Sequence, residues 1–432
     1  MPQSNQPDQP LILLCRHKRN VPSDDSFDAL KVFSDGISLI SGHKEKRYAL
    51  EDIGDVFLSL YPKTYKRVAV IFTIDKGKAK TSVLYERDFP GLQKAIGQVL
   101  KDGWGGFYED RILSGPNLWI NSVSATDAVA ALRNPFVYAF RIKNPKFRNA
   151  EIERVSSCWE VKGKNDLLRM MAEQISQEVA YFSKKHIRPG MTKKTKTRAV
   201  KAIKVITLSK LMTLSLEGYA CGWLSYEESL AWCLVSGKML QSLCDDWDSY
   251  TQHMFDSYDV IKNPDIICNI SYSGELFYSQ NTEGKALQSN YLKSVNQLYR
   301  LSENFRQIPW FTPLDLKTSP AINAEKRALP SDFQYMPELG SREDASITAF
   351  RKPARDLAQC IESGECSVLD VEARLHIATS AVFRLKRELC KSSKMSEWIK
   401  DSFCNTVNRI FQFYSIGIDA FDVWKIHDPK EY

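Results

Sequence analysis

The sequence lacks the marks of an exported or membrane-spanning protein. Residues 1–10 are polar without a basic start, and the apolar run 11–15 is too short for the apolar region of a signal peptide. The most apolar later stretch, residues 200–224, is interrupted by three lysines and a glutamate, whereas a membrane span needs about 20 nearly uncharged residues. We therefore expect a cytoplasmic protein with no transmembrane span, in which residues 200–224 form a buried helix.

Metal-ligand and disulfide patterns are missing too. The ten cysteines are dilute in 432 residues, and no two form a Cys-x-x-Cys pair or a paired zinc-ligand spacing, so we expect a reducing compartment. The six histidines include no pair at i, i+4, and the sequence predicts no metal or cofactor. Five cysteines lie in apolar helical patterns, where a free cysteine acts as a small hydrophobe, and we assign them no chemistry: Cys221, Cys233, Cys244, Cys390 and Cys404.

The motifs of nucleotide binding and acyl transfer are absent as well, since there is no Gly-x-Gly-x-x-Gly, Walker loop or Gly-x-Ser-x-Gly. One loose arrangement formally fits a metal-dependent nuclease, in which two carboxylates hold Mg²⁺ and a lysine orients the attacking water: Asp265, Glu283 and Lys285. The catalytic strand should be apolar before Glu283, but residues 279–282 are polar turn sequence. A nuclease is therefore an alternative interpretation only.

Length and composition indicate a globular protein of several domains. A chain of 432 residues exceeds what one core sustains, so roughly two to three domains are expected. With 43% hydrophobic and 26% charged residues, the chain is neither disordered nor fibrous. Seven short strand-like runs come first, at residues 11–15, 30–33, 37–41, 47–50, 53–60, 68–74 and 80–85. Hairpin turns are predicted at residues 34–36 and 75–78, where Gly and Asp tolerate positive φ.

One amphipathic helix follows these strands. Pro90 fits the first turn of a helix, and apolar residues recur with helical spacing at Leu92, Ala95, Ile96, Val99 and Leu100. This order resembles the pleckstrin-homology-like fold, a curved antiparallel sheet closed at one end by a C-terminal helix. The resemblance implies such a domain at residues 1–110, and members of that family commonly bind a lipid headgroup or a peptide. We favour a structural or protein-docking module.

From about residue 118 the pattern becomes helical. A helix end with glycine punctuation, Gly218-Tyr219-x-x-Gly222-Trp223-Leu224, precedes Ser225-x-Glu227-Glu228, which has the form of a capping box. Together with the aromatic segment 246–250 and the tryptophan-containing turn 158–168, these residues resemble the bacterial family catalogued as domain of unknown function 1266. The resemblance covers about residues 118–280. It implies a helical bacterial domain with no assigned reaction, which we place at residues 111–308.

The C-terminal part is predicted as a linker and a helical hairpin. Five prolines in residues 309–340 argue against regular structure and favour a wrapping linker. In residues 341–432, a helix beginning at Ser367 carries a heptad seam, and a second amphipathic helix over 399–418 can fold back on it. The fold class is therefore α+β: an antiparallel sheet capped by a helix, followed by a mainly α-helical body.

The strongest departure from ordinary composition is a basic segment. Between residues 179 and 216 there are ten lysines and arginines and no acidic residue, while the whole chain has a net charge of only +7. Such a cluster can bind the phosphates of nucleic acid, an anionic membrane surface or an acidic protein partner. We assign anion or partner binding to eight of its residues: Lys184, Lys185, Arg188, Lys193, Lys194, Lys196, Arg198 and Lys201.

Two functions remain open. No Phe, Tyr or Trp lies between residues 184 and 210 to stack on bases, which favours a solvated loop or an acidic protein partner over nucleic acid. The sequence therefore predicts a non-enzymatic interaction or adaptor protein. The alternative is a nucleic-acid-binding protein or the metal-dependent nuclease.

Overall fold

The chain folds into two compact units. The first comprises residues 1–158, 220–222 and 271–309, and the second comprises residues 159–219, 223–270 and 310–432. The computed structural model describes residues 10, 12–15, 27–33, 35–60, 67–75, 78–92, 94–95, 115–130, 142, 145–176, 190, 192–260, 308–315, 322, 328–340, 345–364, 366–390 and 393–428.

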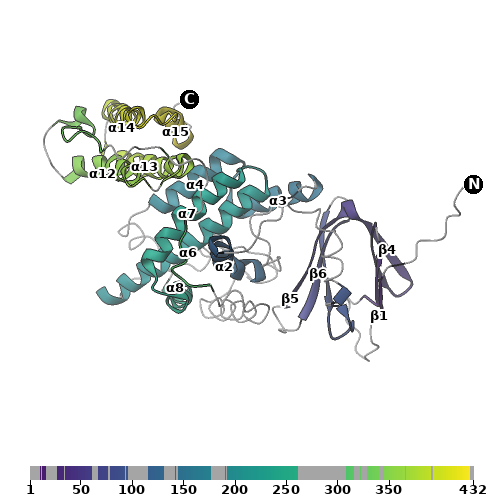
Figure 1. The fold of residues 1–432 in the computed structure, drawn as a ribbon. Helices are drawn as coiled ribbons and strands as arrows, with labels where there is room; N and C mark the ends of the chain where they lie inside the picture. The colour runs from purple at the N-terminus through teal and green to yellow at the C-terminus, as the bar shows by residue number, and fades with distance from the viewer. Residues whose placement is uncertain are drawn as a thin grey trace, which may run out of the picture. The chain divides into compact units, whose positions relative to one another are not determined.

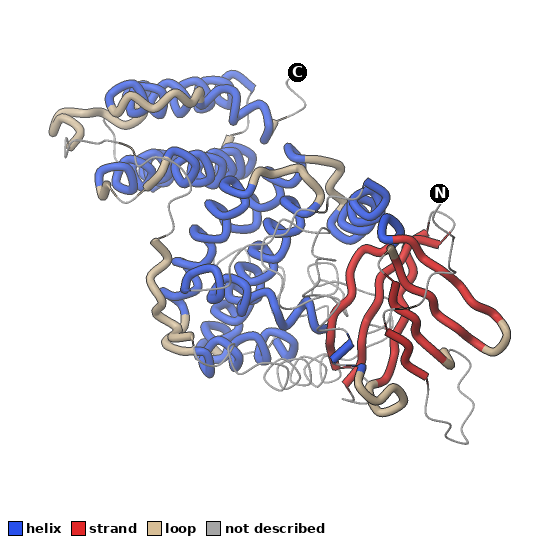
Figure 2. The backbone as a smooth tube through the Cα atoms, turned by 45° about the vertical axis from the view of Figure 1, so that its right-hand side comes forward, coloured by secondary structure: helices blue, strands red, loops and turns tan. Residues whose placement is uncertain are grey.

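The first unit begins with two antiparallel sheets (Figures 1 and 2). A four-stranded sheet has the order β1-β2-β3-β4, and its strands are β1 Ile12–Cys15, β2 Ala29–Phe33, β3 Gly36–Ser41 and β4 Lys44–Ala49. A three-stranded sheet has the order β5-β6-β7, with β5 Ile53–Leu60, β6 Arg67–Asp75 and β7 Lys78–Tyr85. The strands predicted from the sequence are confirmed at all seven positions.

Short turns set the register of these sheets. Phe33 pairs with Gly36, and Asp75 pairs with Lys78, so both predicted hairpin turns are two residues long. Strand β4 begins at Lys44, three residues before its predicted start at residue 47. The prediction missed this start because the first four side chains of the strand are charged and exposed. Only Tyr48 of this strand is buried, so the alternation that marks a half-buried strand is almost missing from it.

The core of this part of the chain draws residues from both sheets. Leu30, Ile37 and Leu39 of the first sheet belong to one buried cluster with Val56 and Ile71 of the second. The beginning of the predicted helix also contributes, because Leu92 joins this cluster. Most of that helix, residues 96–100, lies outside the described residues.

Two helices follow the sheets in the first unit: α2 Gly115–Ala130 and α3 Pro145–Trp159. Helix α3 packs closely on the start of β5, since a Cβ atom on Gly54 would lie 2.4 Å from the Phe147 ring. Lys146 also forms an ion pair with Asp52 at 2.8 Å. Gly54 is therefore required for this close contact.

The described part of the second unit is mostly helical. Its longer helices are α4 Lys164–Ser176, α6 Lys193–Ala220, α7 Tyr226–Leu243, α8 Trp247–Val260, α12 Ala345–Glu362, α13 Val368–Leu389, α14 Ser393–Phe413 and α15 Ala420–His427. Helix α13 packs against α4, α7, α12 and α15, and α12 and α13 lie side by side beneath α14 and α15 in Figure 1. Among the helices that the structure describes, none is both long and apolar enough to cross a membrane.

The corner between α6 and α7 follows from local sequence. Helix α6 ends because the backbone N–H groups of Trp223 and Leu224 donate to the carbonyl of Gly218. The Ser225 side chain accepts from the N–H of Glu228 at 3.1 Å, and the Glu228 carboxylate accepts from the N–H of Ser225 at 2.7 Å. The predicted capping box is confirmed, and so is the buried helix before it.

The predicted C-terminal hairpin forms with two differences. The middle of the α13 seam is buried in one cluster with residues of α14, as expected. However, Leu389 at the end of the seam is 45% exposed, and α13 also packs on α4 and α7, which the seam did not predict. The predicted end of the second helix, at residue 418, is wrong. Helix α14 stops at Phe413, Ser415 takes a left-handed φ of 56°, and a separate helix α15 follows.

The described residues of the proline-rich segment are irregular apart from the 3-10 turn η3, Pro337–Leu339, as predicted. They are nevertheless packed. The indole N–H of Trp310 donates to the carbonyl of Cys244 at 2.8 Å, and Met336 is fully buried. A disulfide joins Cys360 near the end of α12 to Cys366 before α13, a bond that the cysteine spacing does not predict.

Candidate anion-binding site

The structure places five of the eight predicted basic residues together on the first three turns of α6: Lys193, Lys194, Lys196, Arg198 and Lys201. The first four are exposed, and Lys201 is half-buried. The other three predicted residues, Lys184, Lys185 and Arg188, lie outside the described residues. Lys210, further along the same basic segment, is buried at 1% exposure and so is not part of this surface.

The start of α6 concentrates positive potential. Thr192 caps the helix, because its hydroxyl accepts from the N–H of Thr195 at 3.3 Å. No acidic residue lies in the first turn, although the positive end of the helix dipole favours one there. The lysines at this end are repelled by the positive end of the helix dipole and by one another. This arrangement destabilises the isolated helix and favours the binding of an anion.

Most of these cations have no counter-ion among the residues that the structure describes. Within the part of the chain that the structure describes, no carboxylate forms an ion pair with Lys193, Lys194, Lys196 or Lys201. Arg198 is different, since its Nε and Nη2 donate to the two carboxylate oxygens of Asp256 on α8 at 2.5 and 2.7 Å. Asp256 is buried and also accepts from Gln252 at 2.8 Å. This pair ties α6 to α8.

A first hollow of about 720 Å³, the α6–α7 hollow, opens between these two helices. Val200, Met239 and Leu243 form its apolar floor, and Lys193, Lys196, Lys201 and Lys204 stand around it, with Thr197 and Ser242. Met239 and Leu243 are one turn apart on α7 and only partly buried. In its described lining, the hollow thus combines an apolar surface with four basic side chains and no acidic one.

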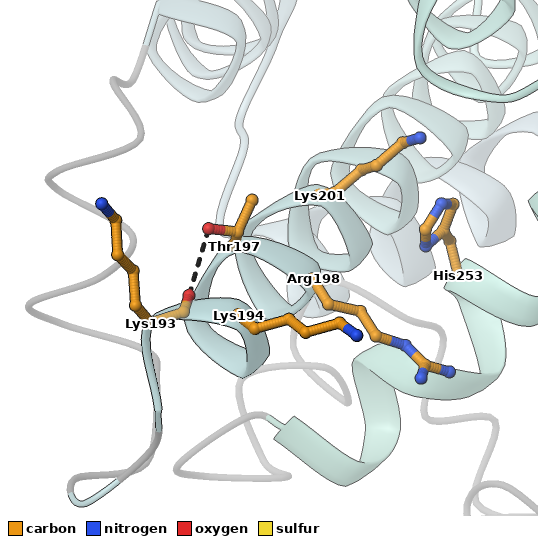
Figure 3. Close-up of a pocket in the computed structure, with 6 residues that line it drawn as sticks. All are labelled: Lys193, Lys194, Thr197, Arg198, Lys201 and His253. Carbon is orange, nitrogen blue, oxygen red and sulfur yellow. Dashed lines mark hydrogen bonds between the residues drawn. The ribbon is translucent and has the colours of Figure 1, made fainter.

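A second hollow of about 630 Å³, the α6–α8 hollow, lies along the same turns of α6. Its lining consists of Lys193, Lys194, Thr197, Arg198, Lys201 and His253. Figure 3 shows Lys194, Arg198 and Lys201 extending to the side where His253 of α8 lies, while Lys193 extends the other way. The Thr197 hydroxyl donates to the Lys193 carbonyl at 3.1 Å.

The surroundings of His253 lower its pKa. Burial has the largest effect and the positive charge of Lys201 the next, while Asp256 and Asp245 oppose them and Arg198 adds a further lowering. Its Nδ1 atom is buried and has no hydrogen-bond partner among the described residues. A buried polar atom of this kind is unfavourable until a partner binds.

The chemistry that this site supports is anion binding. The polar side chains of its described lining are lysines and an arginine, the neutral hydroxyls of Thr197 and Ser242, and His253. Over the described residues, no three of His, Cys, Asp and Glu come together in a way that could hold a metal ion. The proposed nuclease residues Asp265, Glu283 and Lys285 lie outside the described part of the chain.

Comparisons with known proteins identify no relative. No family model, curated protein or solved structure matches this chain. The resemblances to domain of unknown function 1266 and to the pleckstrin-homology-like fold therefore stay predictions.

Sequence reasoning missed the residues that α7 and α8 bring to the site. His253, Asp256 and Met239 carry no local motif, and Asp256 is 58 positions from its partner Arg198. The i, i+4 spacing of Met239 and Leu243 is a signal in the sequence that could have indicated this apolar surface on α7.

Proposed function

We propose that this protein is a non-enzymatic interaction protein that binds an acidic, partly apolar segment of another protein along the first turns of α6. The observation that carries the proposal is the α6–α7 hollow, where basic side chains surround an apolar floor. Three of these, Lys193, Lys196 and Lys201, form no ion pair with a described carboxylate. A segment with one apolar side chain flanked by carboxylates matches both properties.

Electrostatics supports this choice of partner. Lysines that have no counter-ion in the described part of the chain attract an anionic segment and speed its association at low salt. Binding then becomes more favourable when an apolar group of the partner covers the surface formed by Val200, Met239 and Leu243. The lysine stems add to that apolar surface, because their methylene groups line the hollow while the charged ends stay in water.

The same hollows favour a protein over single-stranded nucleic acid. Base stacking needs aromatic faces, and neither hollow is lined by Phe, Tyr or Trp in the residues that the structure describes. A lipid surface would need exposed apolar anchors beside the lysines, whereas the apolar residues here form the floor of a hollow.

A peptide-binding experiment tests the proposal. The probe is a synthetic peptide with a leucine between two pairs of glutamates and a nearby serine, labelled with a fluorophore. We expect wild-type protein to bind it with an affinity that falls with added salt. Lys196→Glu should weaken binding about fivefold, because an exposed ion pair contributes up to about 1 kcal/mol and reversal adds repulsion.

The matched control is Lys162→Glu, an exposed lysine that lines neither hollow and changes the net charge equally. This variant should bind like wild type. Arg198 is avoided in this test, since its replacement would leave Asp256 buried without its ion pair. If the peptide fails to bind at low salt, or if single-stranded DNA of equal charge binds more tightly, the proposal is wrong.

A further inference from the structure

We infer that the α6–α8 hollow is a phosphoryl-binding subsite, which takes the phosphate monoester of a phosphorylated serine or threonine in the partner segment. The inference rests on the proposed function and adds to it the chemistry of a second contact. The α6–α7 hollow would hold the apolar and acidic part of the segment, and the α6–α8 hollow its phosphate.

The donors of this hollow come from two helices. Lys194, Arg198 and Lys201 extend from successive turns of α6 to the side on which His253 of α8 lies (Figure 3). Lysine ammonium groups provide movable point charges, while the arginine offers fixed planar donors. A phosphate monoester has close to two negative charges at neutral pH and three acceptor oxygens, so it can engage donors from several directions. A carboxylate has one charge and two oxygens.

Arg198 is pre-positioned for such a ligand. Its ion pair with Asp256 uses Nε and Nη2, so the Nη1 donors are left without a partner among the described residues. The Arg198 side chain is 56% exposed although its carboxylate partner is buried. The guanidinium is thereby held in one orientation with donors facing outward, which lowers the ordering cost of binding.

His253 supplies the neutral side of the hollow. Its ring lines the hollow, and its buried Nδ1 atom has no hydrogen-bond partner among the described residues. The charged groups that act on His253 are Lys201 and Arg198 from α6, Asp256 on α8 and Asp245 before α8. A bound dianion would add negative charge beside the ring and raise the histidine pKa. Binding of the phosphate is therefore expected to be coupled to proton uptake by His253.

The two hollows can be separated by mutation. Lys194, Arg198 and His253 line only the α6–α8 hollow, whereas Lys196, Lys204 and Met239 line only the α6–α7 hollow. Lys194 and Lys196 are both exposed, lie two residues apart on one helix and carry the same charge. Their glutamine variants change the long-range field equally, so they differ only in the hollow that loses a donor.

The experiment uses the full chain and two forms of the peptide described above, with serine or with phosphoserine at the same position. For wild type, phosphorylation should tighten binding about tenfold or more, because charge-assisted hydrogen bonds are roughly twice as strong as neutral ones. Lys194→Gln should remove most of this gain in affinity on phosphorylation, the increment, and should leave binding of the serine peptide nearly unchanged. Lys196→Gln should weaken both peptides alike and keep the increment.

His253→Gln keeps a neutral donor and removes the titrating ring. The ratio of wild-type to variant affinity for the phosphopeptide should rise as the pH falls from 8 to 6. Protonation of the phosphate, whose second pKa is about 6, affects both proteins equally and cancels in this ratio. Inorganic phosphate at millimolar concentration should lower the apparent affinity for the phosphopeptide until it equals the affinity for the serine peptide. It should not lower it below that value.

The outcomes separate this inference from the proposed function. If both peptides bind wild type equally, or if Lys194→Gln and Lys196→Gln reduce the increment equally, the subsite is wrong and the acidic-segment function stands. If neither peptide binds but single-stranded DNA does, both are wrong. If inorganic phosphate displaces both peptides completely, the hollows act as one unspecific anion surface and the subsite is again wrong.

Discussion

At the scale of single residues, buried ionisable groups distinguish this chain. His376 on α13 and His427 on α15 are both buried, and their Nδ1 and Nε2 atoms lie 3.1 Å apart in a shared hydrogen bond. Burial lowers the pKa of His376 to about 3 and that of His427 to about 4. The pair therefore stays neutral in the folded protein, where one ring donates and the other accepts.

The histidine pair predicts a loss of stability in mild acid. Both rings have pKa values below the unfolded value of 6.5, so the unfolded chain binds more protons as the pH falls through 6.5. Their contribution is fully present above that pH and is lost progressively toward pH 4. We expect a cost on the order of several kcal/mol for the pair.

Urea unfolding of wild type and of His427→Gln between pH 7.5 and 4.5 measures this effect. Glutamine can still bond with the His376 ring and does not titrate. The variant should therefore lose less free energy of unfolding over this range than wild type does. Parallel pH profiles for the two proteins would show that the histidines are not the cause.

At the scale of elements, α13 is the structural centre of the described helices in the second unit. Its N-terminus is fixed by a capping box, in which the Ser367 hydroxyl accepts from the N–H of Asp370 at 3.2 Å and the Asp370 carboxylate accepts from the N–H of Ser367 at 3.0 Å. Its seam residues Leu375 and Val382 are fully buried. Helices α4, α7, α12 and α15 surround most of its circumference.

This packing predicts a large difference between two positions of one seam. Val382→Asp would place a charge without a counter-ion at a fully buried position, at a cost of about 3–5 kcal/mol. Leu389→Asp, on the same seam but 45% exposed, should cost less than about 1 kcal/mol. Chemical denaturation of both variants measures the difference. Equal destabilisation of the two would contradict the burial of the seam.

At the scale of the whole molecule, the two units differ in how far apart in sequence their packed elements lie. The sheets of the first unit are built from strands that are neighbours in sequence, so every described strand pairing joins consecutive strands. The described core of the second unit joins α4 and α7 to α12–α15, elements that are far apart in the chain. The sheet region of the first unit therefore depends less on contacts between distant parts of the sequence.

The sheet region should consequently fold alone. A fragment of residues 10–104 contains both sheets and their shared cluster around Ile37 and Val56, and we expect it to give a dispersed amide spectrum. Addition of residues 105–158 should raise its stability, because Phe147 packs against Gly54. A random-coil spectrum for the shorter fragment would show that its core is insufficient.

Local sequence by itself determined the elements of this protein. Short strand-like runs between turn signals placed the seven strands, glycine and aspartate placed the hairpin turns, and serine with an acidic residue three positions later placed the starts of α7 and α13. These features depend on residues at most a few positions apart, so they can be read without knowledge of the fold. The basic segment of α6 was also evident, because charge is a property of composition.

Only the tertiary structure decided which elements meet. The pairing of Arg198 with Asp256, the position of His253 beside Lys201 and the apolar floor from α7 all join residues distant in sequence. It also decided that Lys210 is buried and that Leu389 is exposed, although each continues the pattern of its neighbours. Periodicity fixes which side of a helix is apolar, whereas the packing of other elements around that helix fixes which of its residues are covered and which remain available to a partner.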